Sequence, residues 1–478
     1  MKRHRGRIGA AFLAMTLGLP PAGLLAQSAS GSSAPLTLQP DSVVQALMEA
    51  RIKLLPYSGM VVGLIDANGE RTLSAGTLNG PGTPAPGAGT LFEIGSVTKT
   101  FTATLLADMV SRGEVQLDEP VSELLPDSVQ VPQRDGKRIT LLDLATQSSG
   151  LPRLPTNMHP ANMEDPYADY SVAQLYSFLS SYDLPRDPGA KYEYSNLGVG
   201  LLGFALARQA DTSYEGLVRT RIAEPLDMPD TRIDLTTAEH GRLAPGHNAA
   251  GDTVANWSAP TLAGAGALRS TLHDMMRYLA ANLRADTTTA LGRDMRTAHM
   301  PRRPTDIPAT RIGLVWMVRD TNATRVIWHN GGTGGYHAFI GFDPTRHMGV
   351  VMLINNTRGA DDIGLHLLDP SVAISPPPPP PPHRTAMALT PAQLQPYVGR
   401  YAIAPGAILT VTLRQDQLFV QLTGQSPLPI YAESDGHFFL KVVDATLDFV
   451  RDDKGNVTAA VLHQNGRDVT AQRMQGGS

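Results

Sequence analysis

The sequence predicts an α+β fold: an antiparallel sheet flanked by helices, with a helical insert, followed by a separate all-β domain. Strand-like runs lie near both ends of the first 370 residues, with helical patterns and loops between them. A run of seven prolines then separates this part from short alternating segments. With 478 residues, 42% hydrophobic and 18% charged, the chain is globular in composition and too long for one ordinary domain.

Residues 1–26 are typical of a secretory signal peptide. Four basic residues among the first seven positions are followed by an apolar stretch over residues 8–19 and then by Leu24-Leu25-Ala26. An N-terminal membrane anchor is the alternative, but the apolar stretch is shorter than the roughly 20 residues that a spanning helix needs. We therefore expect a periplasmic or secreted protein with no membrane span after cleavage.

The composition argues against several classes of function. The chain has no cysteine, so it has no disulfide, no thiolate nucleophile and no lipidated N-terminal cysteine. Removing the four basic residues of the predicted signal peptide from the 40 in the chain leaves 36 basic residues against 44 acidic ones, a net charge of −8. That balance gives no electrostatic reason to expect a nucleic-acid partner.

Neither a metal nor a cofactor is expected. The sequence contains no H-E-x-x-H run and no clustered set of metal ligands. Residues 198–203 match G-x-G-x-x-G, but they follow a loop instead of a buried strand, so we interpret them as a helix-packing surface. The absence of G-x-S-x-G also leaves no obvious place for a nucleophile-elbow hydrolase.

The sheet is expected from strand-like runs at the two ends of the first part of the chain. Two early and three late runs are rich in β-branched or alternating residues, while the region between them is helical or irregular. The runs cover residues 60–66, 71–75, 312–319, 337–342 and 349–355.

The first motif places a serine and a lysine three residues apart, at Ser96 and Lys99, where a helical pattern begins that runs to Gly113. Three residues is just under one helical turn, so both side chains lie on one face. A serine hydroxyl is a poor nucleophile at neutral pH, and an amine in a desolvated site can lose its proton and act as its base. Taken alone, such a pair is more often a helix cap and a solvated lysine.

The second motif, Tyr194 and Asn196, lies in a turn-rich segment that leads into an apolar helix over residues 197–207. Two positions apart in an extended loop, the side chains point the same way. A tyrosine near a lysine cation can pass a proton to a leaving group, and an amide can orient the lysine and a substrate carbonyl. Alternatively, Tyr194 packs on the core and Asn196 caps the helix.

The third motif is His329, Asn330, Gly331 and Gly332, between two strand-like runs. Glycines after the histidine would let a substrate lie against a strand edge and receive backbone hydrogen bonds. A glycine-rich hairpin turn with a surface histidine is the alternative.

The proline run over residues 376–382 is expected to form a stiff, extended spacer. After it, short alternating segments separated by Gly, Asp and Asn turns indicate a small antiparallel barrel or sandwich. These segments cover residues 408–413, 418–423, 428–433, 437–443, 446–451, 457–463 and 468–474.

The three motifs, in this order and at these distances, resemble the signature of serine β-lactamases and penicillin-binding proteins, which is S-x-x-K, then Y-x-N or S-D-N, then K-T-G. The Y-S-N form is similar to class C β-lactamases and the related DD-peptidases and esterases. The resemblance spans roughly residues 41–369 and implies a β-lactamase/transpeptidase-like fold. Residues 397–401 and the strands after them resemble the small β-barrel domain often found downstream of such hydrolases, so we expect a lipocalin-like barrel.

Four segments follow from these observations. They are a signal peptide at residues 1–26, a β-lactamase-like domain at 38–370, a proline-rich linker at 371–390 and an antiparallel β-barrel at 391–474.

Carried over to the matching positions, the resemblance implies that Ser96 is the acylated nucleophile and that Lys99 and Tyr194 transfer protons. Asn196 would orient the lysine and the substrate. The backbone N–H groups of Ser96 and Gly332 would form the oxyanion hole.

The resemblance also implies that His329, Asn330 and Gly331 bind the substrate, but His329 stands where the family usually has a lysine. A histidine is only partly charged at neutral pH, whereas a lysine is a fixed cation for the carboxylate of a β-lactam or a peptide C-terminus. Family members with H-x-G here include DD-carboxypeptidases and endopeptidases, D-amino-acid peptidases and esterases.

The expected function is therefore a serine hydrolase that forms an acyl-enzyme on Ser96 and acts on D-Ala-type peptidoglycan peptides, β-lactams or both. An esterase of the same fold is one alternative. A catalytically inactive sensor that binds a β-lactam or a peptide is another. The expected partner is a small-molecule or peptide substrate, and the oligomeric state is left open.

Overall fold

The computed structural model describes residues 37–474, apart from residues 56, 322, 376–383, 405, 424–426, 442–443 and 465–466. The predicted signal peptide and the proline run lie outside the described residues. The chain divides into two compact units, one ending at Pro380 and the other beginning at Pro381, and each is described by itself.

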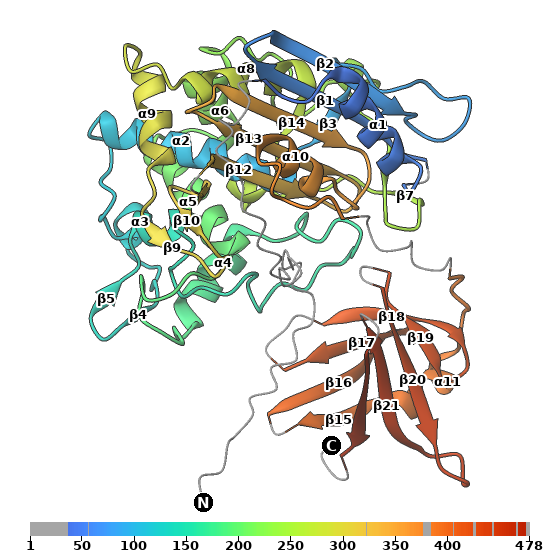
Figure 1. Ribbon diagram of the computed structural model, residues 1–478. Coiled ribbons are helices and arrows are strands. Elements are labelled where there is room, and N and C mark those ends of the chain that lie inside the picture. The colour runs from blue at the N-terminus through green and yellow to red at the C-terminus, as the bar shows by residue number, and fades with distance from the viewer. Residues whose placement is uncertain are drawn as a thin grey trace, which may run out of the picture. The chain divides into compact units, whose positions relative to one another are not determined.

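The first unit contains an eight-stranded antiparallel sheet with the strand order β2-β1-β14-β13-β12-β11-β10-β9. Strands from the two ends of the unit are neighbours, since β1 pairs with β14 (Figure 1). The strands are β1 (Gly59–Asp66), β2 (Gly69–Gly76), β9 (Arg303–Pro304), β10 (Thr310–Ile312), β11 (Met317–Asp320), β12 (Arg325–Gly332), β13 (His337–Asp343) and β14 (Met348–Ile354).

Helices and short strand pairs make up the rest of this unit. The helices are α1 (Asp41–Ile52), η1 (Gly95–Val97), α2 (Thr98–Ser111), η2 (Val121–Leu124), α3 (Leu141–Ala145), α4 (Val172–Ser181), α5 (Asn196–Gln209), α6 (Tyr214–Val218), η3 (Arg219–Ala223), α7 (Thr237–His240), η4 (Ala263–Ala265), α8 (Leu272–Arg284), α9 (Ala290–His299) and α10 (Asp361–Leu368). The pairs are β3 (Leu91–Glu93) with β8 (Arg269–Thr271), β4 (Gln133–Arg134) with β5 (Lys137–Arg138), and β6 (Gly246–His247) with β7 (Thr253–Val254).

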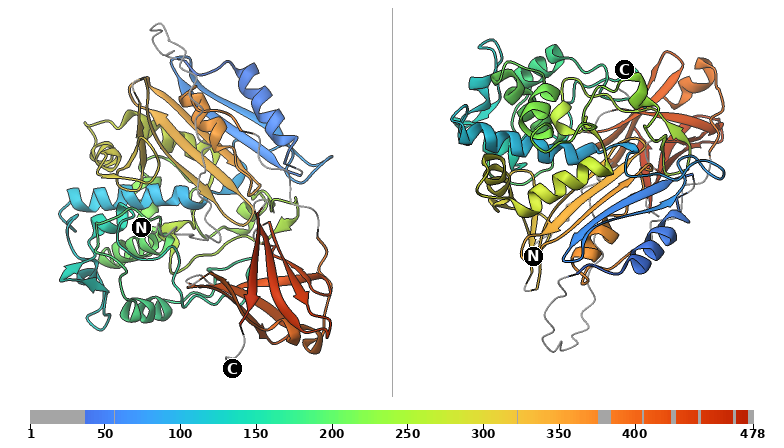
Figure 2. Two further views of the ribbon diagram at one scale, coloured as in Figure 1. Left: turned by 60° about the horizontal axis from the view of Figure 1, so that its bottom comes forward. Right: turned by 90° about the horizontal axis from the view of Figure 1, so that it is seen from above.

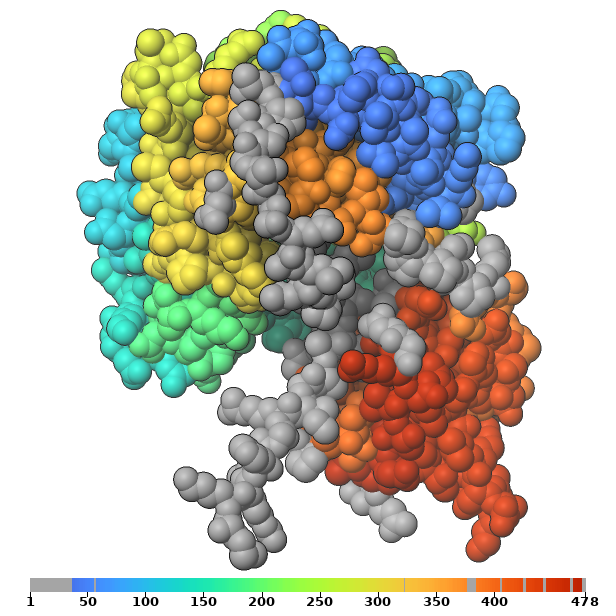
Figure 3. Space-filling model, viewed as in Figure 1, coloured from blue at the N-terminus to red at the C-terminus, as the bar shows by residue number. Residues whose placement is uncertain are grey.

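Alternate side chains of the sheet enter two different cores. In β1, Met60, Val62 and Leu64 pack with residues of α1 and α10, whereas Val61 joins the core that contains α2 and α8. Figure 2 shows helices on both faces of the sheet, and in Figure 3 the segments that hold α1 and α10 lie together on one face. The α+β class expected from the sequence is confirmed.

Two strands differ from the expectation. The run expected over residues 312–319 is a hairpin of β10 and β11, because Ile312 pairs with Met317 and Val315 takes a φ of 66° in the turn between them. Strand β12 was not among the expected runs, since it ends in glycines, which are rare in strands.

The second unit is a closed eight-stranded antiparallel barrel. Of the two architectures that the sequence left open, a barrel and a sandwich, the barrel is confirmed. Leu394, Tyr397, Leu418 and Phe438 are among the side chains that fill its core. The elements are α11 (Pro391–Leu394), η5 (Gln395–Tyr397), β15 (Gly399–Ala404), β16 (Ala407–Arg414), β17 (Gln417–Leu422), β18 (Leu428–Ser434), β19 (His437–Phe439), β20 (Ala445–Arg451), β21 (Val457–Gln464) and β22 (Arg467–Arg473).

A histidine on the barrel is expected to make its stability depend on pH. His463 Nδ1 lies 2.7 Å from Asp468 Oδ1, and its Nε2 lies 3.0 Å from Asp448 Oδ2. The hydrogen bond with Asp468, followed by the two nearby negative charges, raises the His463 pKa. Because His463 binds its proton more tightly in the folded state, the barrel gains its full stabilisation from this group when the pH is below the unfolded-state pKa of about 6.5. The stabilisation is lost as the pH rises through the higher pKa of the folded state. Because the His463 side chain is 34% exposed and that of Asp468 is 72% exposed, we expect the free energy of unfolding to change by less than about 1 kcal/mol.

Thermal unfolding between pH 5 and pH 9 checks this expectation. All three tryptophans belong to the first unit, so the barrel transition is the one seen by circular dichroism and not by tryptophan fluorescence. The variant His463→Gln should flatten the pH dependence of that transition. If His463→Gln leaves the pH dependence of the barrel transition unchanged, groups other than His463 cause that dependence.

Among the helices that the structure describes, none combines the length and the apolar character needed to cross a membrane.

Candidate active site

Ser96 and Lys99 lie at the junction of η1 and α2, in the middle of the first unit. Lys99 Nζ is 2.8 Å from Ser96 Oγ. Lys99 is fully buried, and α2 begins without a side-chain cap from Ser96. The two side chains are therefore paired with each other, unlike a helix cap and a solvated lysine.

The environment of the Lys99 amine favours its neutral form. Nζ donates a hydrogen bond to the backbone oxygen of Ala265, 2.6 Å away. Burial lowers the Lys99 pKa well below its ordinary value, and the nearby positive charge of Arg153 lowers it further. A neutral amine that donates to Ala265 keeps a lone pair for the Ser96 hydroxyl proton, so the geometry suits a general base.

Tyr194 brings a phenol to the same serine. It precedes α5, which is capped by Ser195 through a 2.8 Å hydrogen bond from the Gly198 N–H to Ser195 Oγ. The Tyr194 hydroxyl hydrogen-bonds Ser96, and Lys99 Nζ lies 5.0 Å from the centre of its ring. Burial raises the Tyr194 pKa to about 12, so the phenol stays protonated at neutral pH.

Strand β12 presents an open edge beside these groups. Strand β11 pairs with β12 only as far as Trp328, so β11 leaves the next four residues of β12 unpaired on that side. Thr333 N donates to Tyr336 O, which makes the next pair, Gly332 with His337, a non-hydrogen-bonded one. The N–H of Gly332 therefore points away from β13, toward the open edge.

Glycines let two backbones come into contact at this edge. A Cβ on Gly331 would lie 2.0 Å from the backbone oxygen of Ile94 and 2.9 Å from the Ser96 nitrogen. A Cβ on Gly95, whose φ of 48° is left-handed, would lie 2.7 Å from the Gly332 nitrogen. The N–H groups of Ser96 and Gly332 thus belong to adjoining backbones, an arrangement that suits an oxyanion hole.

His329 carries no charge that a substrate could use. It is 2% exposed, its ring lies 6.4 Å from that of Tyr194, and its Nδ1 is 2.6 Å from the Asn330 backbone oxygen. Burial is the main cause that lowers the His329 pKa to about 3, and the Lys99 amine contributes when it is protonated. A group that stays neutral above pH 5 cannot replace the fixed cation of a lysine.

The Asn330 side chain is directed at helix α10. Its Nδ2 donates to Asp361 Oδ2 at 2.6 Å, on the first residue of α10. The second oxygen of Asp361 pairs with His337 at 2.7 Å. The Asn330 side chain therefore ties β12 to α10.

Asn196 is the first residue of α5 and donates from Nδ2 to the Tyr167 hydroxyl, 3.1 Å away. Its Oδ1 is buried and has no hydrogen-bond partner among the described residues, which leaves an acceptor available. Tyr167 packs against Trp257 with ring centres 5.4 Å apart. These two aromatic residues, the Ala265 carbonyl and Arg153 were not found from the sequence, because no local pattern marks them.

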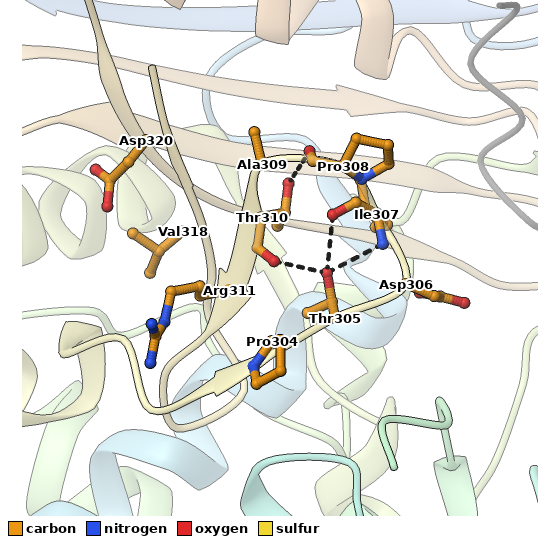
Figure 4. Close-up of a pocket in the computed structure, with 10 residues that line it drawn as sticks. All are labelled: Pro304, Thr305, Asp306, Ile307, Pro308, Ala309, Thr310, Arg311, Val318 and Asp320. Atoms are coloured by element: carbon orange, nitrogen blue, oxygen red, sulfur yellow. Dashed lines mark hydrogen bonds between the residues drawn. The ribbon is translucent and has the colours of Figure 1, made fainter. Parts of the chain in front are cut away.

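A pocket of about 470 Å³ lies on the β9–β10 hairpin, away from the motifs (Figure 4). Thr305 fills its polar centre with hydrogen bonds to the backbone of Ile307 and Thr310. None of the candidate site residues lines it, and it contains no paired nucleophile and base. Within the described part of the chain, no group of three His, Cys, Asp or Glu side chains is placed to hold a metal ion.

Known proteins resemble both units. Residues 42–373 match the family model described as Beta-lactamase, and residues 383–475 match a Domain of unknown function (DUF3471). The D-alanyl-D-alanine-carboxypeptidase/endopeptidase AmpH of Escherichia coli (strain K12) is 27% identical over 320 residues, which cover 63% of this chain and 80% of that protein. A protein named Beta-lactamase from the same strain is 30% identical over 299 residues, covering 56% and 75%.

A crystal structure of a beta-lactamase/D-alanine carboxypeptidase from Yersinia pestis, complexed with citrate, shares the fold. The TM-score is 0.57 at 23% identity, with 66% of this chain and 94% of that chain covered. The resemblance to serine β-lactamases and penicillin-binding proteins is confirmed, since the family model covers well over half of the sequence. This chain belongs to the beta-lactamase family.

Proposed function

We propose that the protein is a serine hydrolase that works through an acyl-enzyme on Ser96. One observation carries this proposal: Ser96 Oγ lies 2.8 Å from a fully buried lysine amine whose pKa is well below its ordinary value. Lys99 has no carboxylate partner in the part of the chain that the structure describes; a buried amine without one is costly, and an inactive binding protein has no need for it. Activation of a nucleophile explains the arrangement.

In the proposed acylation step, Ser96 Oγ forms a bond to the substrate carbonyl carbon, and the hydroxyl proton passes to Lys99 Nζ. The N–H groups of Ser96 and Gly332 donate to the oxygen that becomes negative. Tyr194, protonated because its pKa is about 12, gives its proton to the leaving group and regains one from Lys99. Water, activated by the same pair, then cleaves the ester and restores Ser96.

The substrates that we propose are D-Ala-type peptidoglycan peptides, β-lactams or both. The names of the relatives support this class. The open edge of β12 offers backbone groups to an extended peptide, and Asn196 Oδ1 can accept a substrate N–H. The signal-like residues 1–26 suggest that the protein works outside the inner membrane, where such peptides occur.

Mass spectrometry of the intact protein after reaction with a penicillin tests the proposal. We expect a stoichiometric adduct with the mass of the penicillin. Trypsin should place the adduct on the peptide of residues 72–99, and fragmentation should place it on Ser96 instead of Ser74. No adduct with penicillin and no cleavage of an acyl-D-Ala-D-Ala peptide, or an adduct on another residue, would contradict the proposal.

Esterase activity is a second candidate, and the neutral His329 favours it. Because position 329 carries no positive charge, a carboxylate-bearing substrate gains no ion pair there that an uncharged ester would lack. Comparing a p-nitrophenyl ester with nitrocefin and with a D-Ala-D-Ala peptide separates the two candidates. Exclusive cleavage of the ester would replace the first proposal with the second.

A further inference from the structure

Arg153 places an exposed positive charge beside the candidate catalytic groups. Its guanidinium carbon lies 5.1 Å from the centre of the Tyr194 ring, and Lys99 Nζ lies 5.0 Å from the same point. The side chain is exposed, and no carboxylate among the described residues pairs with it. A guanidinium that stacks on a ring keeps its N–H donors free in the plane of the group.

The backbone holds Arg153 in this place. Ser195 Oγ donates to the Pro152 oxygen at 2.6 Å, and the Leu197 N–H donates to the Arg153 oxygen at 3.2 Å. These two bonds fasten the segment to the residues on either side of Asn196. The position of the arginine next to Tyr194 is therefore built into the fold.

Two other arginines near the site already have carboxylate partners. Arg186 pairs with Glu193, and Arg303 pairs with Asp143 at 2.9 Å. His329 is neutral, as described above. Arg153 is thus a positive charge that lies against the Tyr194 ring and has no carboxylate partner among the described residues.

We propose that Arg153 binds the substrate carboxylate, replacing the cation that is missing at position 329, and that the enzyme selects acyl donors with a free carboxylate. A planar guanidinium binds a carboxylate through two parallel hydrogen bonds, which also fixes the orientation of the substrate. This inference rests on the proposed acyl-enzyme function. The carboxylate can come from a peptide C-terminus or from a β-lactam, and matched substrates distinguish the two sources.

The test compares carboxylate and neutral forms of the same substrate. One pair is an acyl-D-Ala-D-Ala peptide and its C-terminal methyl ester, and the other is a penicillin and its methyl ester. For Arg153→Gln we expect kcat/KM to fall about 10- to 100-fold for the carboxylate forms and to stay within about threefold for the neutral forms. Arg153→Lys should lower kcat/KM for the carboxylate forms less than Arg153→Gln does, because lysine keeps the positive charge but cannot form the two parallel hydrogen bonds.

The measurements belong on the pH plateau of each variant. Arg153 lowers the Lys99 pKa, so its removal raises that pKa and moves the acidic limb of activity to higher pH for every substrate. The double variant Arg186→Gln with Glu193→Gln is the matched control, because it removes a nearby ion pair without changing the net charge, and it should leave the carboxylate-to-neutral ratio unchanged.

The outcomes separate the two proposals. Equal losses for both forms, or no loss for either carboxylate form, would overturn the role of Arg153 while the hydrolase assignment stands. A loss confined to the peptide pair or to the penicillin pair identifies the source of the bound carboxylate. Failure of the wild type to turn over any of the four compounds would overturn the proposed function and this inference with it.

Discussion

Replacing Lys99 by methionine is expected to lower kcat/KM by on the order of 10³-fold or more while leaving the protein folded. The amine is the only side-chain base within hydrogen-bond distance of Ser96 Oγ besides the protonated Tyr194 phenol, among the described residues. Methionine has a similar length and no charge to bury, so the loss of the Ala265 hydrogen bond is offset by the removal of a desolvated amine. The melting temperature should therefore change little or rise.

Stopped-flow acylation rates and thermal melts of the same preparations check this prediction. Ser96→Ala removes the nucleophile and sets the lower limit of activity. Lys99→Arg is the matched control for charge, because arginine stays protonated and cannot accept the serine proton, so it should be as inactive as Lys99→Met. Activity of Lys99→Met within about tenfold of the wild type would mean that another group is the base.

The sequence predicted the parts of this site that local spacing determines. Ser96 and Lys99 share a face because a helix repeats every 3.6 residues, and the apolar runs of β1, β13 and β14 mark strands because both faces of the sheet are covered. The order of the three motifs then indicated the family, since unrelated chains seldom combine them. These inferences need no knowledge of contacts between distant segments.

The rest depends on contacts through space. Ala265 contributes a backbone oxygen, which any residue could supply, so no side chain marks it. Arg153 reaches Tyr194 only because two hydrogen bonds fasten its loop to the start of α5. The sequence around His329 fits a surface histidine equally well. Its pKa of about 3 results mainly from burial, which the sequence alone does not predict.

The contact between the backbones of β12 and η1 predicts the second large effect on activity. Gly331→Ala is expected to lower kcat by about 10²- to 10³-fold, because the added Cβ would lie 2.0 Å from the Ile94 oxygen and 2.9 Å from the Ser96 nitrogen. Both obstacles are backbone atoms, so the strand itself must move away. That movement separates the N–H groups of Ser96 and Gly332, which are proposed to bind the same oxygen.

Two other glycine variants show whether this loss arises at the site or from general destabilisation. At Gly332 a Cβ would meet nothing closer than His337 Nδ1 at 3.6 Å, and alanine keeps the backbone N–H, so Gly332→Ala should lose far less activity. At Gly313 a Cβ would lie 2.4 Å from the Ala298 oxygen, away from the motifs, so Gly313→Ala should lower the melting temperature with little change in kcat. Acylation rates measured well below each melting temperature separate the two effects. If Gly331→Ala and Gly313→Ala lower kcat equally, the close approach of β12 to η1 is not what aligns the two N–H donors. If only Gly331→Ala lowers kcat, the oxyanion hole depends on the absence of a side chain at position 331.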